Sequence, residues 1–495
     1  MGSEQIEDVI YEITKKGFQV EPVAFEKLIK LYEIRKDLDL KKALLSIADN
    51  KRKSEPHSVF IDGKDIDFLF PKKEDLVEDD FIYDKITPNL KVIHDPGNEI
   101  IISEGIEGFA KYFLSRYIKL LNIVNSRPSH KAITKIEQLM SNGRNIRIAG
   151  LVKQKRVKKG AVLLELEDDS GAIDVYAKFD SQNRNALEAL HDQMLIADIS
   201  SVKQGLAFAS DIQFPEVPDR ILRERSSEIY VLLLSDLHIG SKAFDREIFE
   251  HLIHWLQGQH GDRELVKRLK YVIIAGDLVD GVGVYPQQEK ELELLEIRDQ
   301  YAQAAKYLKE FPSSLQIIII PGNHDATRQA LPQPSIPNKY CKELYELDNV
   351  KMFGDPLNIE LHGVNFLIYH GRSLDDVFAS VPNVDPSKPE NIMKILLRAR
   401  HLAPTFGART TIAPANEDTL VIDTPPDVLH AGHIHVFGHS TYRGTTIVNS
   451  GTFQRQTPHQ KSMGINPTPG KVAILSLRTM NIIERDFNQF VTHLN

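Results

Sequence analysis

The chain has 495 residues, of which 42% are hydrophobic and 26% are charged, the balance of an ordinary globular protein. This length suggests about three domains. The formal net charge of −8 excludes a basic protein that coats nucleic acid. Any contact with nucleic acid would therefore come from local patches of charge.

Cys341 is the only cysteine, which excludes an internal disulfide framework and a metal cluster held by thiolates, and which fits a reducing compartment. The first residues lack the charged-then-apolar pattern of a signal peptide, and no apolar run approaches the roughly 20 residues that cross a bilayer. We therefore expect a cytoplasmic protein without a membrane partner.

Residues 1–50 are expected to form a small helical module, because apolar side chains such as Ile10 and Ile13 recur at helical spacing. The charged stretch 49–56 indicates a mobile linker. Residues 51–130 are expected to comprise this linker and a helical segment. Within them the pattern predicts a strand at 90–93 and a helix at 109–124.

Residues 131–215 change to short alternating strands, which predicts a five-stranded β-barrel of the OB type. Asp168 to Gly171 is expected to form a turn between two strands, and a helix is expected near 182–190. The basic hairpin 153–160 could bind a single nucleic-acid strand, but such a hairpin is more often only solvated.

A linker at 215–227 precedes an α/β domain at 228–495, in which strands and helices alternate. The expected strands are 229–234, 271–275 and 316–320, and the expected helices are 244–257 and 288–308.

Each apolar strand of this last domain is followed by residues that commonly bind metals. An extended Asp236-x-His238 would place both side chains on the same side of its strand. Two carboxylates at neighbouring strand ends repel each other unless a cation lies between them. The candidates at the five strand ends, which include four or five histidine ligands, are Asp236, His238, Asp277, Asn323, His324, His370, His433 and His435.

This set of oxygen and nitrogen ligands without a thiolate suits Mn²⁺, Fe or Zn²⁺ better than Ca²⁺. Two such ions about 3.5 to 4 Å apart would clamp a phosphodiester, activate a water molecule and neutralise charge on the leaving oxygen. Each fragment alone could be structural, for example a helix cap at Asp236. Five fragments in sequence favour a metal site.

These motifs resemble the full signature of the calcineurin-like metallophosphoesterases, in order and spacing, from residue 229 to about 450. They are Asp236-x-His238, Gly276-Asp277, Gly322-Asn323-His324-Asp325, His370-Gly371 and Gly432-His433-x-His435. The resemblance implies a β-sandwich flanked by helices, preceded here by the barrel and the helical module.

The same resemblance implies two metal ions that share Asp277. One ion would be held by Asp236, His238, Asp277 and His435, and the other by Asp277, Asn323, His370 and His433. His324 would protonate the leaving oxygen, and Asp325 would orient the imidazole of His324. Manganese is the expected metal, with iron and zinc as alternatives.

Four stretches that lie largely outside the metal signature are similar to the small subunit of archaeal family-D DNA polymerases. They are residues 321–334, 400–407, 426–433 and 449–457. The likeness extends from about residue 130 to the end of the chain. It implies a 3′ to 5′ exonuclease that proofreads for a large polymerase subunit, with the single-stranded primer end as substrate. It leaves open a contact with the sliding clamp through the complex.

The segment between His370 and Asp427 is an insertion relative to a minimal phosphoesterase, and a helix is expected at 392–402. We expect arginines of this segment to guide the DNA end, although they could instead pair with Asp375, with Asp376 or with the large polymerase partner. The arginines assigned to DNA are Arg328, Arg372, Arg398, Arg400 and Arg409.

Two other functions compete with this hypothesis. Related eukaryotic subunits are scaffolds whose metal motifs have decayed, but every expected ligand is present here. A stand-alone nuclease for double-strand-break repair would share the metal signature, but it would not explain the preceding barrel.

Overall fold

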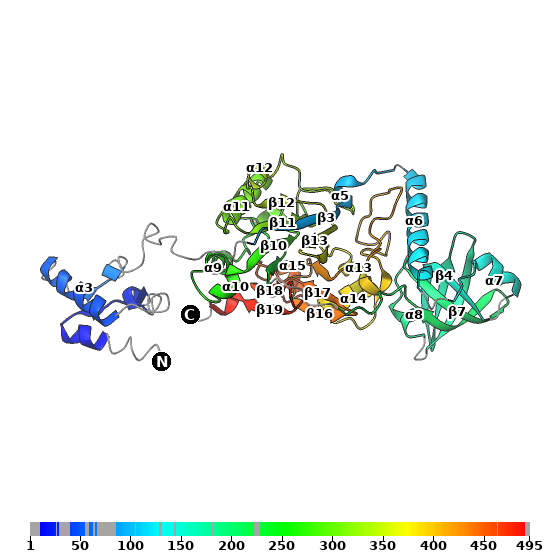
Figure 1. Cartoon of the computed structure of the whole chain (residues 1–495), viewed down its shortest axis with the longest axis horizontal. Helices are drawn as coiled ribbons and strands as arrows, with labels where there is room; N and C mark the ends of the chain where they lie inside the picture. Colours follow the sequence, from blue (N-terminus) through cyan, green and yellow to red (C-terminus); the bar gives the residue numbers. More distant parts are fainter. Residues whose placement is uncertain are drawn as a thin grey trace. The chain divides into compact units, whose positions relative to one another are not determined.

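The computed structural model describes residues 10–25, 27–28, 40–54, 59–62, 65–66, 86–103, 105–127, 131–142, 145–179, 183–221, 228–462 and 464–490. The chain divides into two compact units (Figure 1). One comprises residues 1–83 and 254–267, and the other comprises residues 84–253 and 268–495. None of the helices among these described residues is long and apolar enough to cross a membrane.

The N-terminal unit contains α3 (Leu40–Ser54) and a parallel pair of short strands, β1 (Gln19–Val20) and β2 (Phe60–Ile61). Its core includes the predicted apolar residue Ile13. The linker predicted from residue 49 is wrong up to Ser54, because that stretch completes α3. Lys51 is buried there and pairs with Asp65. Residues 55–56 and 222–227 of the predicted linkers lie outside the described residues.

The predicted barrel is present as a closed sheet in the order β4-β5-β6-β8-β7. As predicted, Asp168 forms a turn, and its Oδ1 accepts a hydrogen bond from the backbone N of Ser170 at 2.8 Å. The helix expected near 182–190 is a single turn, α8 (Asn185–Glu188). The strands are β4 (Ile146–Lys158), β5 (Ala161–Glu167), β6 (Ala172–Lys178), β7 (Met194–Lys203) and β8 (Leu206–Gln213).

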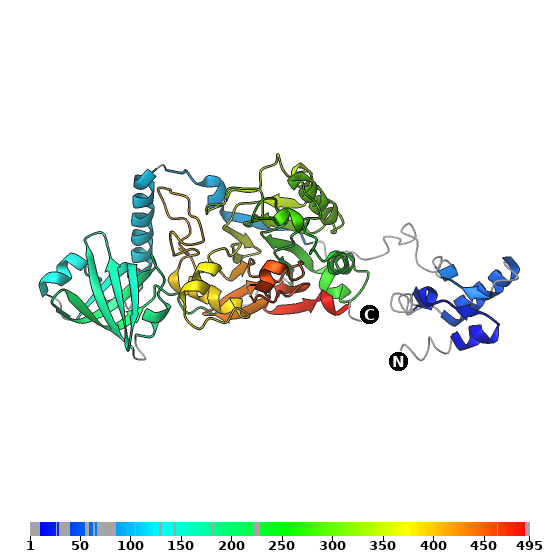
Figure 2. The ribbon, with the colours of Figure 1, turned by 180° about the vertical axis from the view of Figure 1, so that it is seen from behind.

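The C-terminal half of the long helix α6 (Gly105–Asn125) lies against the barrel, as both views show (Figures 1 and 2). Its apolar residues Tyr117, Leu120 and Val124 pack on residues of β4 and β7. Two shorter helices precede and follow it, α5 (Pro96–Glu99) and α7 (Ile136–Asn142).

Two six-stranded sheets form the remainder of the second unit. The first has the order β12-β11-β10-β9-β18-β19, and the second has the order β16-β17-β15-β14-β13-β3. The strands of the first are β9 (Tyr230–Leu234), β10 (Leu269–Ala275), β11 (Gln316–Ile320), β12 (Val350–Met352), β18 (Lys471–Ser476) and β19 (Ile482–Asp486). Those of the second are β3 (Leu90–His94), β13 (Leu357–Leu361), β14 (Val364–Ile368), β15 (Val428–Ala431), β16 (Gly438–Tyr442) and β17 (Thr445–Asn449).

Apolar side chains from both sheets form one buried core, for example Ile273 and Ile318 from the first and Phe366 and Ile368 from the second. The predicted β-sandwich is therefore present. The helices that lie between or after these strands in the chain are α9 (Arg246–Leu256), α10 (Arg263–Lys267), η1 (Gln288–Lys290), α11 (Ile297–Lys309), α12 (Lys342–Tyr345), α13 (Leu374–Ser380), α14 (Pro389–Ala399), α15 (Pro458–Ser462) and η2 (Phe487–Phe490).

Two sequence predictions differ from this arrangement. The strand expected at 90–93 is present as β3, but it pairs with β13, so it belongs to the sandwich rather than to a linker. The helix expected at 288–308 is divided between η1 and α11, because Glu293 and Leu294 donate backbone hydrogen bonds to the carbonyl of Gly240. A tertiary contact therefore replaces helical hydrogen bonds in the middle of this segment.

Candidate metal centre

The predicted ligands follow strands β9, β10 and β11 of the first sheet and β14 and β15 of the second. Neighbouring strands within each of these sets are parallel, so their carboxyl ends meet at one edge of each sheet. The two edges are joined directly, because the backbone N of His433 donates to Asp236 Oδ2 at 2.8 Å.

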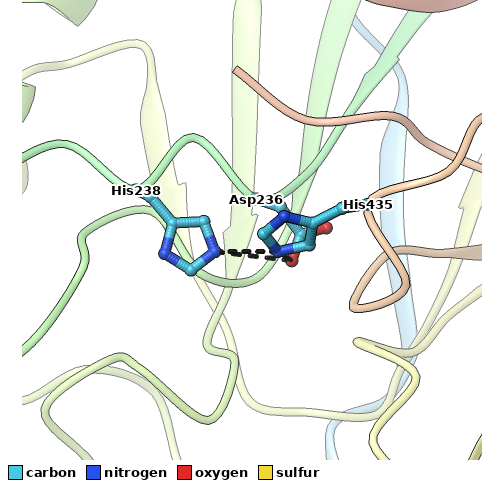
Figure 3. A group of neighbouring side chains, drawn as sticks. All are labelled: Asp236, His238 and His435. Atoms are coloured by element: carbon cyan, nitrogen blue, oxygen red, sulfur yellow. Dashed lines mark hydrogen bonds and ion pairs between the residues drawn. The ribbon is translucent and has the colours of Figure 1, made fainter. Parts of the chain in front are cut away.

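One group of ligands contains Asp236, His238 and His435 (Figure 3). Asp236 Oδ1 lies 3.9 Å from His238 Nε2 and 3.4 Å from His435 Nε2. The two imidazole Nε2 atoms are 3.0 Å apart. Three side chains from two sheets therefore direct ligand atoms at one point.

The second group contains Asp277, His370 and His433, whose ligand atoms all lie within 4.8 Å of one another. His370 Nε2 is 3.3 Å from Asp277 Oδ2 and 3.0 Å from Asn323 Oδ1. Asp277 Oδ2 also lies 3.7 Å from His238 Nε2 of the first group. One carboxylate oxygen thus lies between the groups, where a bridging ligand is expected.

The backbone at the site is left-handed at five of the predicted ligands, with φ between 51° and 73° at Asp236, His238, Asp277, His433 and His435. Such values are uncommon for residues other than glycine, and they concentrate at functional sites. The extended Asp236-x-His238 expected from the sequence is therefore wrong. The two side chains converge because the chain turns after β9, not because strand side chains alternate.

The buried carboxylates create a strongly negative field. Burial raises the pKa of Asp277, but the charges of His370 and His324 outweigh burial and hold it well below its usual range. Burial likewise lowers the pKa of His370, yet Asp277 outweighs it and raises the pKa to about 10. This field stabilises positive charge at the site, whether carried by protons or by metal cations.

The residues present fit divalent metal ions. Asp236 Oδ1 is buried and accepts no hydrogen bond from any residue that the structure describes. Leaving such an atom without a partner is costly unless a cation binds it. The carboxylates, imidazoles and amide are ligands typical of Mn²⁺, Fe and Zn²⁺ sites.

His324, the predicted acid, lies beside both groups, and its backbone N donates to Asp277 Oδ1 at 2.8 Å. Its ring Nδ1 is 2.6 Å from the carbonyl oxygen of Asp280. Burial lowers the pKa of the imidazole. The side chain is therefore positioned by a backbone carbonyl through Nδ1.

The predicted role of Asp325 needs correction. Its carboxylate accepts hydrogen bonds from the backbone N of Gly322 at 2.9 Å and from the hydroxyl of Tyr301 at 3.0 Å. Burial raises the pKa of Asp325 to about 6. Asp325 thus stabilises the loop that carries His324, and it does not hold the imidazole itself.

Asp280 is a site residue that the sequence analysis missed. Its buried Oδ1 is 2.9 Å from His238 Nδ1 and accepts a hydrogen bond from Gln454 Nε2 at 2.9 Å, and Gln288 Nε2 donates to Oδ2 at 3.0 Å. The carboxylate thus orients His238, while the carbonyl of the same residue orients His324. The only sequence signal is its position three residues after Asp277, which does not distinguish it from a helix cap.

The five arginines assigned to DNA lie in different surroundings. Arg372 and Arg409 line a hollow beside His324. Arg328 also lines it, but its guanidinium donates to the carbonyls of Ala330 and Pro332. These three are near the candidate centre.

Arg398 and Arg400 are elsewhere, which corrects their predicted role. Arg398 pairs with Glu188 of the barrel, and its guanidinium lies 4.3 Å from the ring centroid of Phe214. Arg400 is only 3% exposed and donates to the backbone carbonyls of Ile422 and Asp423. Both arginines stabilise contacts within the protein.

Two further histidines near the last motif, His430 and His439, contact other side chains of the protein. His430 is buried and pairs with the Ser450 hydroxyl at 2.7 Å, and burial lowers its pKa to about 3. His439 pairs with Glu484 at 2.8 Å. Each of these histidines therefore has a structural contact within the protein.

The two sheets, the ligands at their edges and the preceding barrel define a calcineurin-like phosphoesterase fold with an OB-like module. Comparison with known sequences narrows this class. The family model that describes the B subunits of DNA polymerases alpha and epsilon matches residues 231–439.

Three curated relatives named DNA polymerase II small subunit are similar over most of their length. The Archaeoglobus fulgidus protein is 39% identical over 388 residues, 78% of each chain. The Methanothermobacter thermautotrophicus protein is 39% identical over 80% of this chain and 83% of its own. The Pyrococcus furiosus protein is 37% identical over 87% of this chain and 73% of its own. The chain belongs to the family of DNA polymerase II small subunits.

Solved structures are similar to parts of the chain. A novel archaeal phosphodiesterase aligns over 52% of this chain and 99% of its own, at 14% identity and a TM-score of 0.27. Vps29 from Entamoeba histolytica in complex with zinc aligns over 52% of this chain and 100% of its own, at 14% identity and a TM-score of 0.26.

Proposed function

We propose that the chain is the exonuclease subunit of a two-subunit archaeal replicative DNA polymerase. It would hydrolyse phosphodiesters at the 3′ end of the primer and so remove mispaired nucleotides for a large polymerase subunit. The main support is the meeting of all seven predicted ligands in two groups on either side of Asp277, with His324 beside them. The relatives are named small subunits, and this name supports the proposal that a large polymerase subunit is the partner.

The residues suggest how hydrolysis would proceed. Two divalent ions, when bound, would polarise the phosphodiester and lower the pKa of an attacking water. Asp236, His238 and His435 would hold one ion, and Asn323, His370 and His433 the other, with Asp277 shared between them. Manganese is our first choice of metal, with iron and zinc as alternatives.

His324 would supply the proton that the leaving group needs. As the water oxygen, having lost one proton to solvent, bonds to phosphorus, the bond from phosphorus to the 3′ oxygen breaks. The imidazolium form of His324 would protonate that oxygen from Nε2 and be left as the neutral ring. The Asp280 carbonyl, 2.6 Å from Nδ1, keeps the ring oriented during this transfer. A nucleotide 5′-monophosphate and a shortened strand with a 3′ hydroxyl would result.

The test is a nuclease assay on a primer with a mismatched 3′ end, with chelator-treated protein reloaded with Mn²⁺, Fe²⁺ or Zn²⁺. We expect the wild type to shorten the primer, and both His324→Ala and Asp277→Ala to lose roughly a hundredfold or more in rate. His439→Ala, which removes a histidine outside the ligand set, should match the wild type. Assays with and without the large subunit separate the chain's own activity from that of the complex.

Two outcomes would contradict the proposal. An inactive wild type that also binds no metal by elemental analysis would favour a scaffold subunit. Unchanged activity in both variants would assign the nuclease to another site.

A further inference from the structure

A hollow of about 920 Å³ opens beside the candidate acid. Its lining includes Asn323, His324 and His433 of the candidate centre, together with side chains that have no part in metal binding. This volume is within the range of pockets that enclose a small organic ligand. The hollow is therefore large enough for part of a substrate beyond the phosphate that reacts.

Part of the lining is apolar although it faces solvent. Val282 and Val284 are 49% and 39% exposed, and both line the hollow. The ring of Tyr340 also lines it, with Lys339 Nζ 4.7 Å from the ring centroid. Exposed apolar side chains gathered at a concave site are typical of a surface that binds a ligand.

The loop that carries the two valines is held firmly. Buried Gln300 accepts a hydrogen bond from the backbone N of Gly281 at 2.9 Å and donates to its carbonyl at 3.1 Å. Buried Gln288 accepts from the backbone N of Val284 at 2.9 Å. Gly281 has φ of +75°, and a Cβ there would lie 2.3 Å from the His324 carbonyl oxygen. The valines are therefore presented by a fixed backbone directly beside His324.

Two arginines, Arg372 and Arg409, also line the hollow. Arg409 has a 62% exposed side chain and lies 3.8 Å from Asp375, which in turn lies 3.3 Å from His433. Arg372 donates to the carbonyl of Gln329 at 2.9 Å. The loop with the two valines is thus beside His324, and Arg409 is linked through Asp375 to His433. The hollow therefore offers apolar side chains for a flat group and guanidinium groups for phosphates.

We propose that Val282, Val284 and Tyr340 hold the terminal base of a single DNA strand while Arg372 and Arg409 hold its phosphates. A base stacks on apolar and aromatic side chains, and guanidinium groups pair with phosphate oxygens. The base can reach this surface only after it has left its base pair, and leaving costs least at a mismatch. The hollow would therefore select mispaired ends. This inference rests on the proposed function.

The test compares two single-stranded oligonucleotides that differ only in the last residue, a normal nucleotide or an abasic one. We expect the wild type to prefer the normal end at least about fivefold in kcat/KM, the effect of one stacked base. In the double variant Val282→Ser/Val284→Ser, and in Tyr340→Ala, the ratio of kcat/KM for the normal end to that for the abasic end should fall toward one. Ile221→Ser, which changes a side chain that is 95% exposed and outside the hollow, should keep it.

A second substrate distinguishes failure of the proposed nuclease function from failure of the inference about the hollow. The wild type is assayed on bis(p-nitrophenyl) phosphate, which has no base and reports on the metal centre. If it cleaves neither this diester nor DNA, the proposed function fails. If it cleaves both but treats normal and abasic ends alike, or if the valine and tyrosine variants retain the wild-type preference, the inference about the hollow is overturned.

Discussion

Among the single residues around the centre, Asp280 contacts two of the candidate functional histidines. Its carboxylate contacts His238, and its carbonyl contacts His324, so one residue orients a candidate ligand and the candidate acid. Residues that orient metal-binding histidines commonly matter almost as much as the ligands themselves.

Asp280→Asn should therefore weaken metal binding by about 10- to 100-fold, because the amide is a poorer acceptor for the His238 N–H. The measurement is calorimetric titration of chelator-treated protein with Mn²⁺, which needs no nuclease assay. Asp198→Asn, which removes a carboxylate paired with Arg147 on the barrel, serves as the control. Equal Mn²⁺ affinity in wild type and Asp280→Asn would show that His238 does not depend on this contact.

At the scale of elements, α14 and the loop that follows it place three arginines of one sequence segment in different surroundings. Arg398 is on α14 and faces the barrel, where Glu188 and Asn185 bind its guanidinium. Arg400 caps the end of α14 with φ of 55°. Arg409 lies in the following loop and reaches the hollow. Only the last of these can contribute a charge to a DNA strand at the centre.

We expect Arg409→Ala to reduce the salt dependence of single-strand binding by about 0.7 in the slope of log affinity against log salt, the value for one lost phosphate contact. Arg398→Ala should leave the slope unchanged. Fluorescence anisotropy of a labelled oligonucleotide at several KCl concentrations measures both, with His324→Ala as the background to prevent cleavage. A flatter slope in Arg398→Ala alone would restore the DNA-guiding role first assigned to it.

At the scale of the whole second unit, a buried ionic cluster joins the barrel, α6 and the sandwich. Arg116 of α6 donates from Nε to Asp418 Oδ2 at 2.7 Å and from Nη1 to the Asp192 carbonyl at 3.1 Å. His401 Nε2 lies 2.8 Å from the same Asp418 oxygen, and His401 Nδ1 accepts from the backbone N of Ala403 at 3.0 Å. Both ring nitrogens of the neutral imidazole are therefore satisfied.

Burial lowers the pKa of His401 from 6.5 to about 4. As the pH falls below 6.5, the unfolded chain takes up this proton while the folded chain does not, so stability decreases until about pH 4. The expected loss is about 3 kcal/mol in the free energy of unfolding.

Urea titrations of chelator-treated protein between pH 7 and pH 4 measure this loss. His401→Gln removes the titrating group, so its free energy of unfolding should change less over the same range, whatever its stability at pH 7. Parallel pH profiles for the two proteins would contradict the prediction.

The sequence by itself determined the three strands at 229–234, 271–275 and 316–320 and the ligand types at the strand ends. That information is local, because a β-branched apolar run predicts a buried strand and a Gly-Asp or Asn-His step fixes what emerges at its end. The barrel could also be predicted, because the alternation of apolar and polar residues and the turn residues are patterns of a few positions. The seven ligands could therefore be named before any geometry was known.

Only the tertiary structure decided which neighbours each of these residues meets. The contact of His324 with the Asp280 carbonyl, the burial of Arg398 against the barrel and the pairing of β3 with β13 all join distant parts of the chain. Helical spacing likewise predicted one helix at 288–308, where hydrogen bonds to Gly240 impose a break. Such partners depend on packing across the fold, and packing overrides local preference wherever the two conflict.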